Sequence, residues 1–216
     1  MQITIREPGS AITHFVGMML AVFAAVPLLV KAGITSGWQN MAAMAIFMAS
    51  TILLYGASAT YHSVNLAGTR LKLFRKIDHM MIFVLIAGTY TPVCLIILGG
   101  QIGYTLLAVV WSIAAIGILV KAIWVTCPKW FSSLIYIAMG WVCVFVFGSL
   151  WESLPLTGFL WLLAGGIIYT IGGVIYALKL PIFNSRHKEF GSHEVFHLFC
   201  MAGSTCHFIF MYLYVA

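Results

Sequence analysis

Seven long apolar stretches follow one another along this chain of 216 residues, and they constrain its fold more than any other feature. A helix needs roughly 20 residues to cross the hydrocarbon core of a bilayer at 1.5 Å per residue. The stretches cover residues 12–31, 39–63, 77–98, 103–122, 131–150, 157–179 and 193–215. Because only short connections remain between them, we predict an all-α membrane protein, a seven-transmembrane helical bundle that forms a single domain over residues 1–216.

The composition agrees with a membrane protein and excludes a soluble one. Hydrophobic residues make up 62% of the chain and charged residues only 7%, whereas soluble domains carry about 25% charged residues. The net charge of +6 does not indicate nucleic-acid binding, because the basic residues lie in short connections and form no stripe with interleaved aromatics. We therefore expect membrane lipids as partners and no nucleic acid, and the sequence leaves open a homo-oligomer.

The basic residues predict the orientation of the chain. An odd number of spans puts the two termini on opposite sides of the membrane. With the N-terminus in the cytoplasm, ten of the eleven Lys and Arg residues fall on the cytoplasmic side and only Lys31 lies outside. Since basic residues concentrate in cytoplasmic connections, we predict a multi-pass protein of the cell inner (plasma) membrane with its N-terminus in the cytoplasm and its C-terminus on the outer side.

Small residues inside the stretches are expected to serve packing. The five cysteines include no CxxC pair, so we interpret them as small buried hydrophobes, with neither disulfides nor thiolate metal ligands. Glycines at helical spacing in the sixth stretch should let neighbouring helices approach closely; they are Gly165, Gly166, Gly172 and Gly173. Pro92 lies within the third stretch, where we expect a kink.

Five polar residues are placed where a bilayer penalises them, and all five face one side of the membrane. They are Ser58 and His62 at the end of the second stretch, Asp78 at the start of the third, and His193 and His197 at the start of the seventh. Each pair spaced by four residues projects from one helix face. The end of an even span and the start of an odd span share a side, here the cytoplasmic one, so these residues should converge.

Three imidazoles and a carboxylate at one depth predict a metal site, and Zn²⁺ is the expected ion. We expect His62, His193 and His197 to be the ligands, with an open position for water. Asp78 would hold that water, whose pKa zinc lowers to about 7, and would pass on its proton. Ser58 would bond either Asp78 or a substrate oxygen. The alternative is that these are interfacial histidines satisfied by headgroups and water.

Other polar residues are expected to serve roles outside the set of metal ligands. Glu7, Ser10 and His14 are spaced by three and four, which predicts a cap for the first helix with a buried face. Glu194 should point away from the ligand face. His207 lies ten residues beyond His197, or about 15 Å along a helix, which is too far to join the same metal.

His79 adjoins Asp78 but faces about 100° away from it on a helix. A connection-facing or interhelical role is therefore expected for His79, and not a fourth metal contact.

Six motifs occur along the chain in a specific order. They are EPGSAITH at 7–14, SATYH at 58–62, KIDH at 76–79, AGTYTP at 87–92, AMGW at 138–141 and GSHEVFHLFCMAGSTCHF at 191–208. In this order and spacing the chain resembles the hemolysin III family, the bacterial branch of the progestin and adipoQ receptor superfamily, over essentially its whole length.

The resemblance implies seven helices, a cytoplasmic N-terminus and a zinc site. In the receptor branch a His on the second helix and two on the seventh hold zinc, which implies His62, His193 and His197 here. An Asp and a Ser lie nearby in that branch, which correspond to Asp78 and Ser58. The family is also similar to alkaline ceramidases, whose zinc-activated water cleaves a lipid amide.

From these observations we expect a zinc-dependent hydrolase acting on membrane lipid, or a membrane lipid homeostasis factor. The family name comes from lysis of red cells, so one alternative is a pore-forming, cytolytic, channel-like protein. No span carries the continuous polar stripe that a water-filled path would need. The other alternative is a receptor or sensor whose metal site is purely structural.

Overall fold

The computed structural model describes residues 5–178 and 191–216, and every regular element in these ranges is helical. The elements are α1 (Pro8–Ser36), α2 (Trp38–Ser63), α3 (Gly68–Pro92), the π-helix η1 (Val93–Leu98), α4 (Gly100–Ile123), α5 (Lys129–Gly140), the 3₁₀-helix η2 (Trp141–Val146), α6 (Phe147–Ser153), α7 (Leu156–Leu178), α9 (Ser192–Phe210) and the π-helix η3 (Met211–Val215). Continuous helical units within these ranges provide seven candidate membrane spans, each long and apolar enough to cross a bilayer. The prediction of an all-helical protein with seven candidate spans is confirmed.

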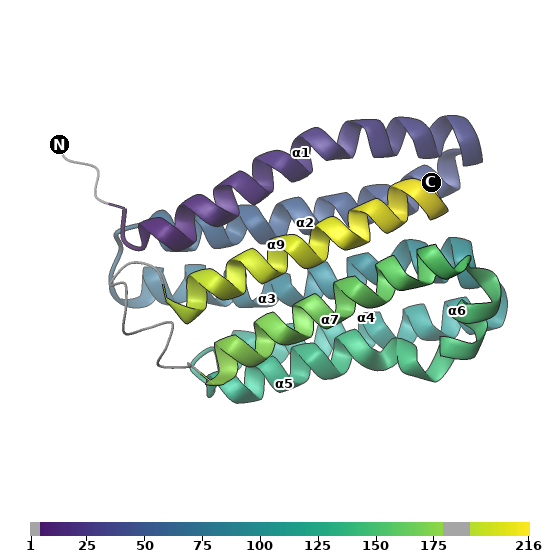
Figure 1. Cartoon of the computed structure of the whole chain (residues 1–216). Coiled ribbons are helices and arrows are strands. Elements are labelled where there is room, and N and C mark those ends of the chain that lie inside the picture. Colours follow the sequence, from purple (N-terminus) through teal and green to yellow (C-terminus); the bar gives the residue numbers. More distant parts are fainter. Residues whose placement is uncertain (1–4, 179–190) are drawn as a thin grey trace.

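The helices form one elongated bundle, with the two chain ends at opposite ends of it (Figure 1). α1 packs along α2, α2 along α3, and α7 along α9. The last span also contacts the first, because α9 packs against α1. The end of α2 and the start of α9 are thereby brought together at the end of the bundle where α1 begins.

Two helices begin at least four residues earlier than the apolar stretches suggest. α1 starts at Pro8, before the expected residue 12, and α3 starts at Gly68, before the expected residue 77. Hydropathy detects only apolar runs, whereas the intervening segment of α3 contains Leu, Lys and Arg, which are good helix formers. These extra turns carry polar side chains past the apolar stretch and toward the site described below.

Breaks in the helices coincide with Pro and Gly. The backbone changes from α to π geometry directly after Pro92, which has no amide hydrogen to donate. Gly99 and Gly100 make the turn into α4 with φ of 57° and 48°, a region that glycine adopts without steric cost.

The packing predicted for the α7 glycines holds at three of four positions. Gly165 lies against His207, Gly172 against Phe199, and Gly173 against Ile137. A Cβ added at Gly166 would meet nothing within 4 Å, because this residue faces a cavity instead of a helix. The expectation of helix packing is therefore wrong for Gly166.

The cysteines form no disulfide, as expected: all five are free. Cys94, Cys127 and Cys200 are buried, while Cys143 and Cys206 are partly exposed. Cys127 is more than an apolar filler, because its sulfur lies 3.0 Å from Nζ of the buried Lys121.

Candidate metal centre

Three histidines meet where the end of α2 lies beside the start of α9. His62 is in the last turns of α2, and His193 and His197 lie one turn apart at the start of α9. One ring nitrogen from each falls within 4.8 Å of the others, and Nε2 of His62 is 3.2 Å from Nε2 of His193. The side-by-side placement predicted from span counting is confirmed, and the buried cluster could hold a metal ion.

The outward-facing nitrogens of two of these rings are fixed by hydrogen bonds. Nδ1 of His62 donates to the Glu7 carboxylate. Nδ1 of His197 lies 3.3 Å from the backbone oxygen of Ser10, to which it donates, and 3.3 Å from the hydroxyl of Thr13. With Nδ1 protonated in both rings, each Nε2 keeps its lone pair for a metal, the arrangement that usually orients histidine ligands.

The donor set fits a zinc ion. Zinc accepts imidazole nitrogens, and sites that do chemistry combine three protein ligands with one open position. The Nε2 atoms of His62 and His193 lie at hydrogen-bond distance, so either a shared proton or a cation can occupy the space between them. His193 also has a buried Nδ1 without a hydrogen-bond partner among the described residues, so its ring is held by packing against Tyr176, at a centroid distance of 5.3 Å.

Glu7 does not cap α1, although it occupies the N-cap position: it makes no side-chain capping hydrogen bond. Its carboxylate instead reaches across to His62, and its backbone N–H donates to the His62 carbonyl at 3.0 Å. The hydrogen bond from His62 holds the pKa of Glu7 below its usual range, although partial burial acts the other way, and Arg6 at 3.3 Å adds to the lowering. The capping hypothesis is thus wrong for Glu7, because the His62 imidazole of α2 competes for its side chain.

The buried face predicted for the start of α1 is confirmed. Ser10 and His14 are both buried, and the His14 ring stacks on His197 with centroids 3.6 Å apart and planes 5° from parallel.

The Ser10 hydroxyl donates to Glu194 at 2.5 Å. Glu194 also accepts the backbone N–H of Gly191 at 2.8 Å and so caps α9 beside His193. Glu194 points off the ligand face, as expected, and stabilises the helix end that carries the ligands.

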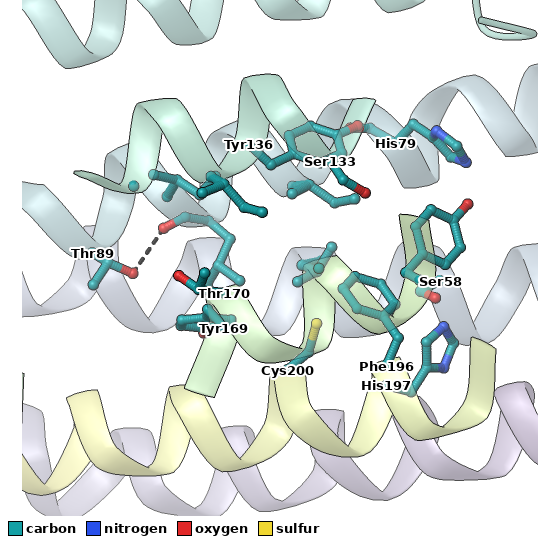
Figure 2. Close-up of a pocket in the computed structure, with 18 of the residues that line it drawn as sticks. Ser58, His79, Thr89, Ser133, Tyr136, Tyr169, Thr170, Phe196, His197 and Cys200 are labelled. Atoms are coloured by element: carbon teal, nitrogen blue, oxygen red, sulfur yellow. Dashed lines mark hydrogen bonds between the residues drawn. The ribbon is translucent and has the colours of Figure 1, made fainter. Parts of the chain in front are cut away.

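Asp78 and Ser58 lie together at the edge of a cavity that also reaches His193 and His197. Both are buried, at 7% and 1% exposure, and the Ser58 hydroxyl interacts with the Asp78 carboxyl. The cavity has a volume of about 140 Å³ and is otherwise largely apolar. Figure 2 shows Ser58, His79 and His197 toward one end of it and Thr89 toward the other.

His79 and His207 lie outside the cluster. His79 lines the cavity without joining the three nitrogens, and its carbonyl accepts the Tyr136 hydroxyl at 3.1 Å. His207 lies farther along α9, where Nε2 donates to the Leu162 carbonyl at 3.2 Å.

A second cavity of about 70 Å³ lies beside His207 and shares Thr89, Tyr90 and His207 with the first cavity. Apolar space therefore continues along the bundle axis.

Comparison with known proteins gives consistent matches over nearly the whole chain. A family model described as "Haemolysin-III related" matches residues 2–208. The chain is 37% identical to Hemolysin-3 of Bacillus cereus over 210 residues, covering 97% of this chain and 92% of that protein. It is 37% identical to a Hemolysin-3 homolog of Bacillus subtilis (strain 168) over 212 residues, covering 98% and 95%. An adiponectin receptor protein of Drosophila melanogaster is 23% identical over 219 residues, covering 94% of this chain and 49% of the receptor.

Proposed function

This chain belongs to the haemolysin-III-related family, which is related to the adiponectin receptors, and from that premise we propose that it is a Zn²⁺-dependent hydrolase of membrane lipid. The proposal rests on one observation above all. Three imidazoles, of which those of His62 and His197 are buried, converge beside an apolar cavity that His193 and His197 line and whose wall carries Asp78 and Ser58.

Each residue of the site has a task in such a reaction. A zinc ion held by His62, His193 and His197 would polarise a carbonyl and lower the pKa of water to about 7. Asp78 accepts a proton on its carboxylate and returns it to the leaving group. Ser58 orients that carboxylate by donating its hydroxyl hydrogen.

The apolar cavity supports a lipid substrate. From Asp78 to Thr89, both of which line it, α3 rises about 16 Å. An acyl chain lying along this wall would fill apolar space and keep water from the scissile bond. Membrane lipid is thus the proposed partner, and turnover of such lipid would serve membrane lipid homeostasis.

We further propose that the end of the bundle with the histidines faces the cytoplasm. Of the described residues, seven basic ones lie at this end, and only Lys31 lies at the other. By the positive-inside preference this orientation is favoured, with the cell inner (plasma) membrane as the location.

The two alternative functions have less support. The second cavity is lined by apolar residues such as Val93, Leu106 and Leu163, whereas a conducting path needs polar groups or water along its length. A purely structural metal would stabilise the contact between α2 and α9 but would give Asp78 and Ser58 no task.

The experiment measures metal and lipid together. Full-length protein purified in detergent should carry about one zinc per chain, and a His193→Ala/His197→Ala variant should carry none. His207→Ala is the matched control, because His207 is a buried histidine of the same helix outside the cluster. If the unchanged protein binds no metal, the proposal is wrong.

An Asp78→Asn variant separates chemistry from ligation. It should keep its zinc yet lower lipid turnover by about 10²-fold or more, as expected when a proton-transferring group is lost. Cells that produce it should then lose the lipid products seen with the unchanged protein. Equal lipid profiles in the two strains, with zinc retained in both, would favour the purely structural site.

A further inference from the structure

Three polar side chains form a buried cluster where α4 ends and α5 begins. Lys121 lies in the last turn of α4, Cys127 in the connection and Ser132 in the first turn of α5. All three are buried, and Lys121 is only 1% exposed. Nζ of Lys121 donates to Sγ of Cys127 at 3.0 Å and to Oγ of Ser132 at 2.6 Å. Oγ of Ser132 lies 3.2 Å from the same sulfur, so each group contacts the other two.

This cluster is separate from the candidate metal centre. Its members line neither of the two cavities and do not belong to the histidine cluster. The proposed hydrolase therefore gives them no task. A buried ammonium, thiol and hydroxyl in mutual contact are costly to desolvate, and an apolar filler at each position would avoid that cost. The arrangement thus points to chemistry of its own.

The sulfur of Cys127 is the counter-charge available to Lys121. A buried ammonium is stable only when an anion pairs with it. Within residues 5–178 and 191–216, both ion pairs involve Glu7, and no carboxylate lies within 4.0 Å of the Lys121 nitrogen. Of the two groups that accept its hydrogen bonds, the thiol ionises far more readily than the hydroxyl. The geometry therefore favours a thiolate–ammonium pair inside the protein.

The surroundings of Cys127 make its thiol a better nucleophile. Burial raises the pKa of this thiol, but the hydrogen bonds from Lys121 and Ser132 lower it. The positive charges of Lys121 and Arg75 also lower it, and the net direction of the pKa is downward. A lower pKa increases the fraction of thiolate at neutral pH, and the thiolate is the reactive form.

Cys127 lies just beneath the surface of the bundle. It is 5% exposed, and its two neighbours in the chain, Thr126 and Pro128, are exposed. A molecule as small as hydrogen peroxide needs only a slight movement of this connection to meet the sulfur, whereas a bulky reagent needs the connection to open. Cysteines that respond to oxidants combine thiolate character with access, which favours a peroxide as the reacting partner.

We propose that Cys127 is a site of oxidation by hydrogen peroxide and that the amine of Lys121 captures the oxidised sulfur in a covalent nitrogen–sulfur bond. A sulfenic acid condenses with a neighbouring thiol or nitrogen. All five cysteines are free, and in the described part of the chain the side chains that contact this sulfur are Lys121 and Ser132. The amine therefore takes the place of a second thiol. This inference does not depend on the proposed hydrolase.

The reaction balances in two steps. In the first, Sγ of the Cys127 thiolate attacks one peroxide oxygen, so that an S–O bond forms, the O–O bond breaks, the sulfur is oxidised and the peroxide is reduced. The departing hydroxide takes a proton from the Lys121 ammonium and leaves as water. In the second, the neutral Nζ attacks the sulfur, so that an N–S bond forms and the S–O bond breaks. That hydroxide takes a proton from the nitrogen and leaves as a second water.

The test identifies the cysteine that reacts and the product that forms. Full-length protein in detergent is treated with hydrogen peroxide, digested with trypsin and analysed by mass spectrometry. Cys127 should react about tenfold faster than Cys206, which is partly exposed and has no lysine or arginine in contact within the described ranges. Trypsin should no longer cleave after Lys121, and the uncleaved peptide should be lighter than its unmodified sequence by two hydrogen atoms. Dithiothreitol should reverse both changes.

Two replacements of Lys121 separate its two tasks. Lys121→Met removes the charge, so oxidation of Cys127 should slow about tenfold and no cross-link should form. Lys121→Arg keeps the charge, so oxidation should stay fast. A guanidinium keeps its proton and does not attack the sulfur, so sulfenic acid should accumulate and be trapped by dimedone. Lys76→Met is the matched control, because Nζ of Lys76 donates to the carbonyl of Ala122 beside the cluster and contacts no sulfur.

Three results would overturn the proposal. If Cys127 is oxidised no faster than Cys206, the cluster does not activate the sulfur, and this comparison needs no variant. If the unchanged protein accumulates sulfenic acid without the lighter peptide, Lys121 does not capture the sulfur. If Lys76→Met slows the oxidation as much as Lys121→Met, the effect belongs to the general surface charge. Thermal unfolding of each variant checks that the fold is intact, and the loss of metal or of lipid turnover would change none of these outcomes.

Discussion

At the residue scale, Glu7 determines which nitrogen of His62 is available to a metal. Its carboxylate accepts the Nδ1 hydrogen and leaves Nε2 facing His193. The sequence predicted the three histidines, because helical spacing and span counting are enough to bring them to one place. It did not predict the task of Glu7 or the stacking of His14 on His197. Those contacts depend on how α1 is rotated about its axis, which hydropathy does not determine.

Replacing Glu7 by Gln should weaken metal binding without abolishing it. The amide oxygen can still accept the Nδ1 hydrogen, but the lost charge makes the His62 ring a poorer donor, and partners of this kind typically contribute 10–100-fold in metal affinity. Competition with a chromogenic chelator measures the affinity. Glu152→Gln, an exposed change at the other end of the bundle, should leave it unaltered. An unaltered affinity in the Glu7 variant would show that the carboxylate has no influence on the site.

At the element scale, apolar stretches identified the spans but not where the helices begin. α3 continues nine residues ahead of its apolar run, to Gly68, because amphipathic basic segments form helices that hydropathy does not detect. These turns carry Arg70, Lys72, Arg75 and Lys76 on the helix beyond the apolar run. The glycines of α7 illustrate a similar limit. The sequence shows that they recur at helical spacing, but only the packed structure shows which of them contact a neighbouring side chain and therefore have no room for a Cβ.

Two adjacent glycines of α7 should therefore respond oppositely to the same substitution. In Gly165→Ala the new Cβ would overlap the ring of His207, so we expect a destabilisation of about 1–3 kcal/mol from overpacking. In Gly166→Ala the Cβ enters open space, and the better helix propensity of alanine should leave stability unchanged or raise it by up to about 1 kcal/mol. Thermal unfolding in detergent measures both; similar losses for the two variants would contradict the packing described for α7.

At the scale of the whole molecule, seven spans place the chain ends at opposite ends of the bundle (Figure 1). This much follows from the sequence, because the number of long apolar stretches is unambiguous. The cavity does not follow from the sequence, since its volume depends on side chains of α1, α2, α3, α5, α7 and α9, and no periodicity specifies the angles at which these helices meet. The positions of the Lys and Arg residues predict one further property of the whole molecule, its orientation across the membrane.

Orientation can be measured with single cysteines in a variant that lacks the five native ones. With the N-terminus in the cytoplasm, Ala216→Cys should react with a membrane-impermeant maleimide in intact cells, and Ile5→Cys should react only after the cells are permeabilised. The physical reason is the concentration of Lys and Arg at the histidine end of the bundle. The opposite labelling pattern would place the histidines, and any lipid they act on, at the outer leaflet.

The histidine cluster draws on α2 and α9, which are separated by most of the chain. When six of the seven spans have been synthesised, the chain contains His62 but neither His193 nor His197. Any ion that these three histidines hold can therefore bind only after α9 has been made, and it would link α9 to α2.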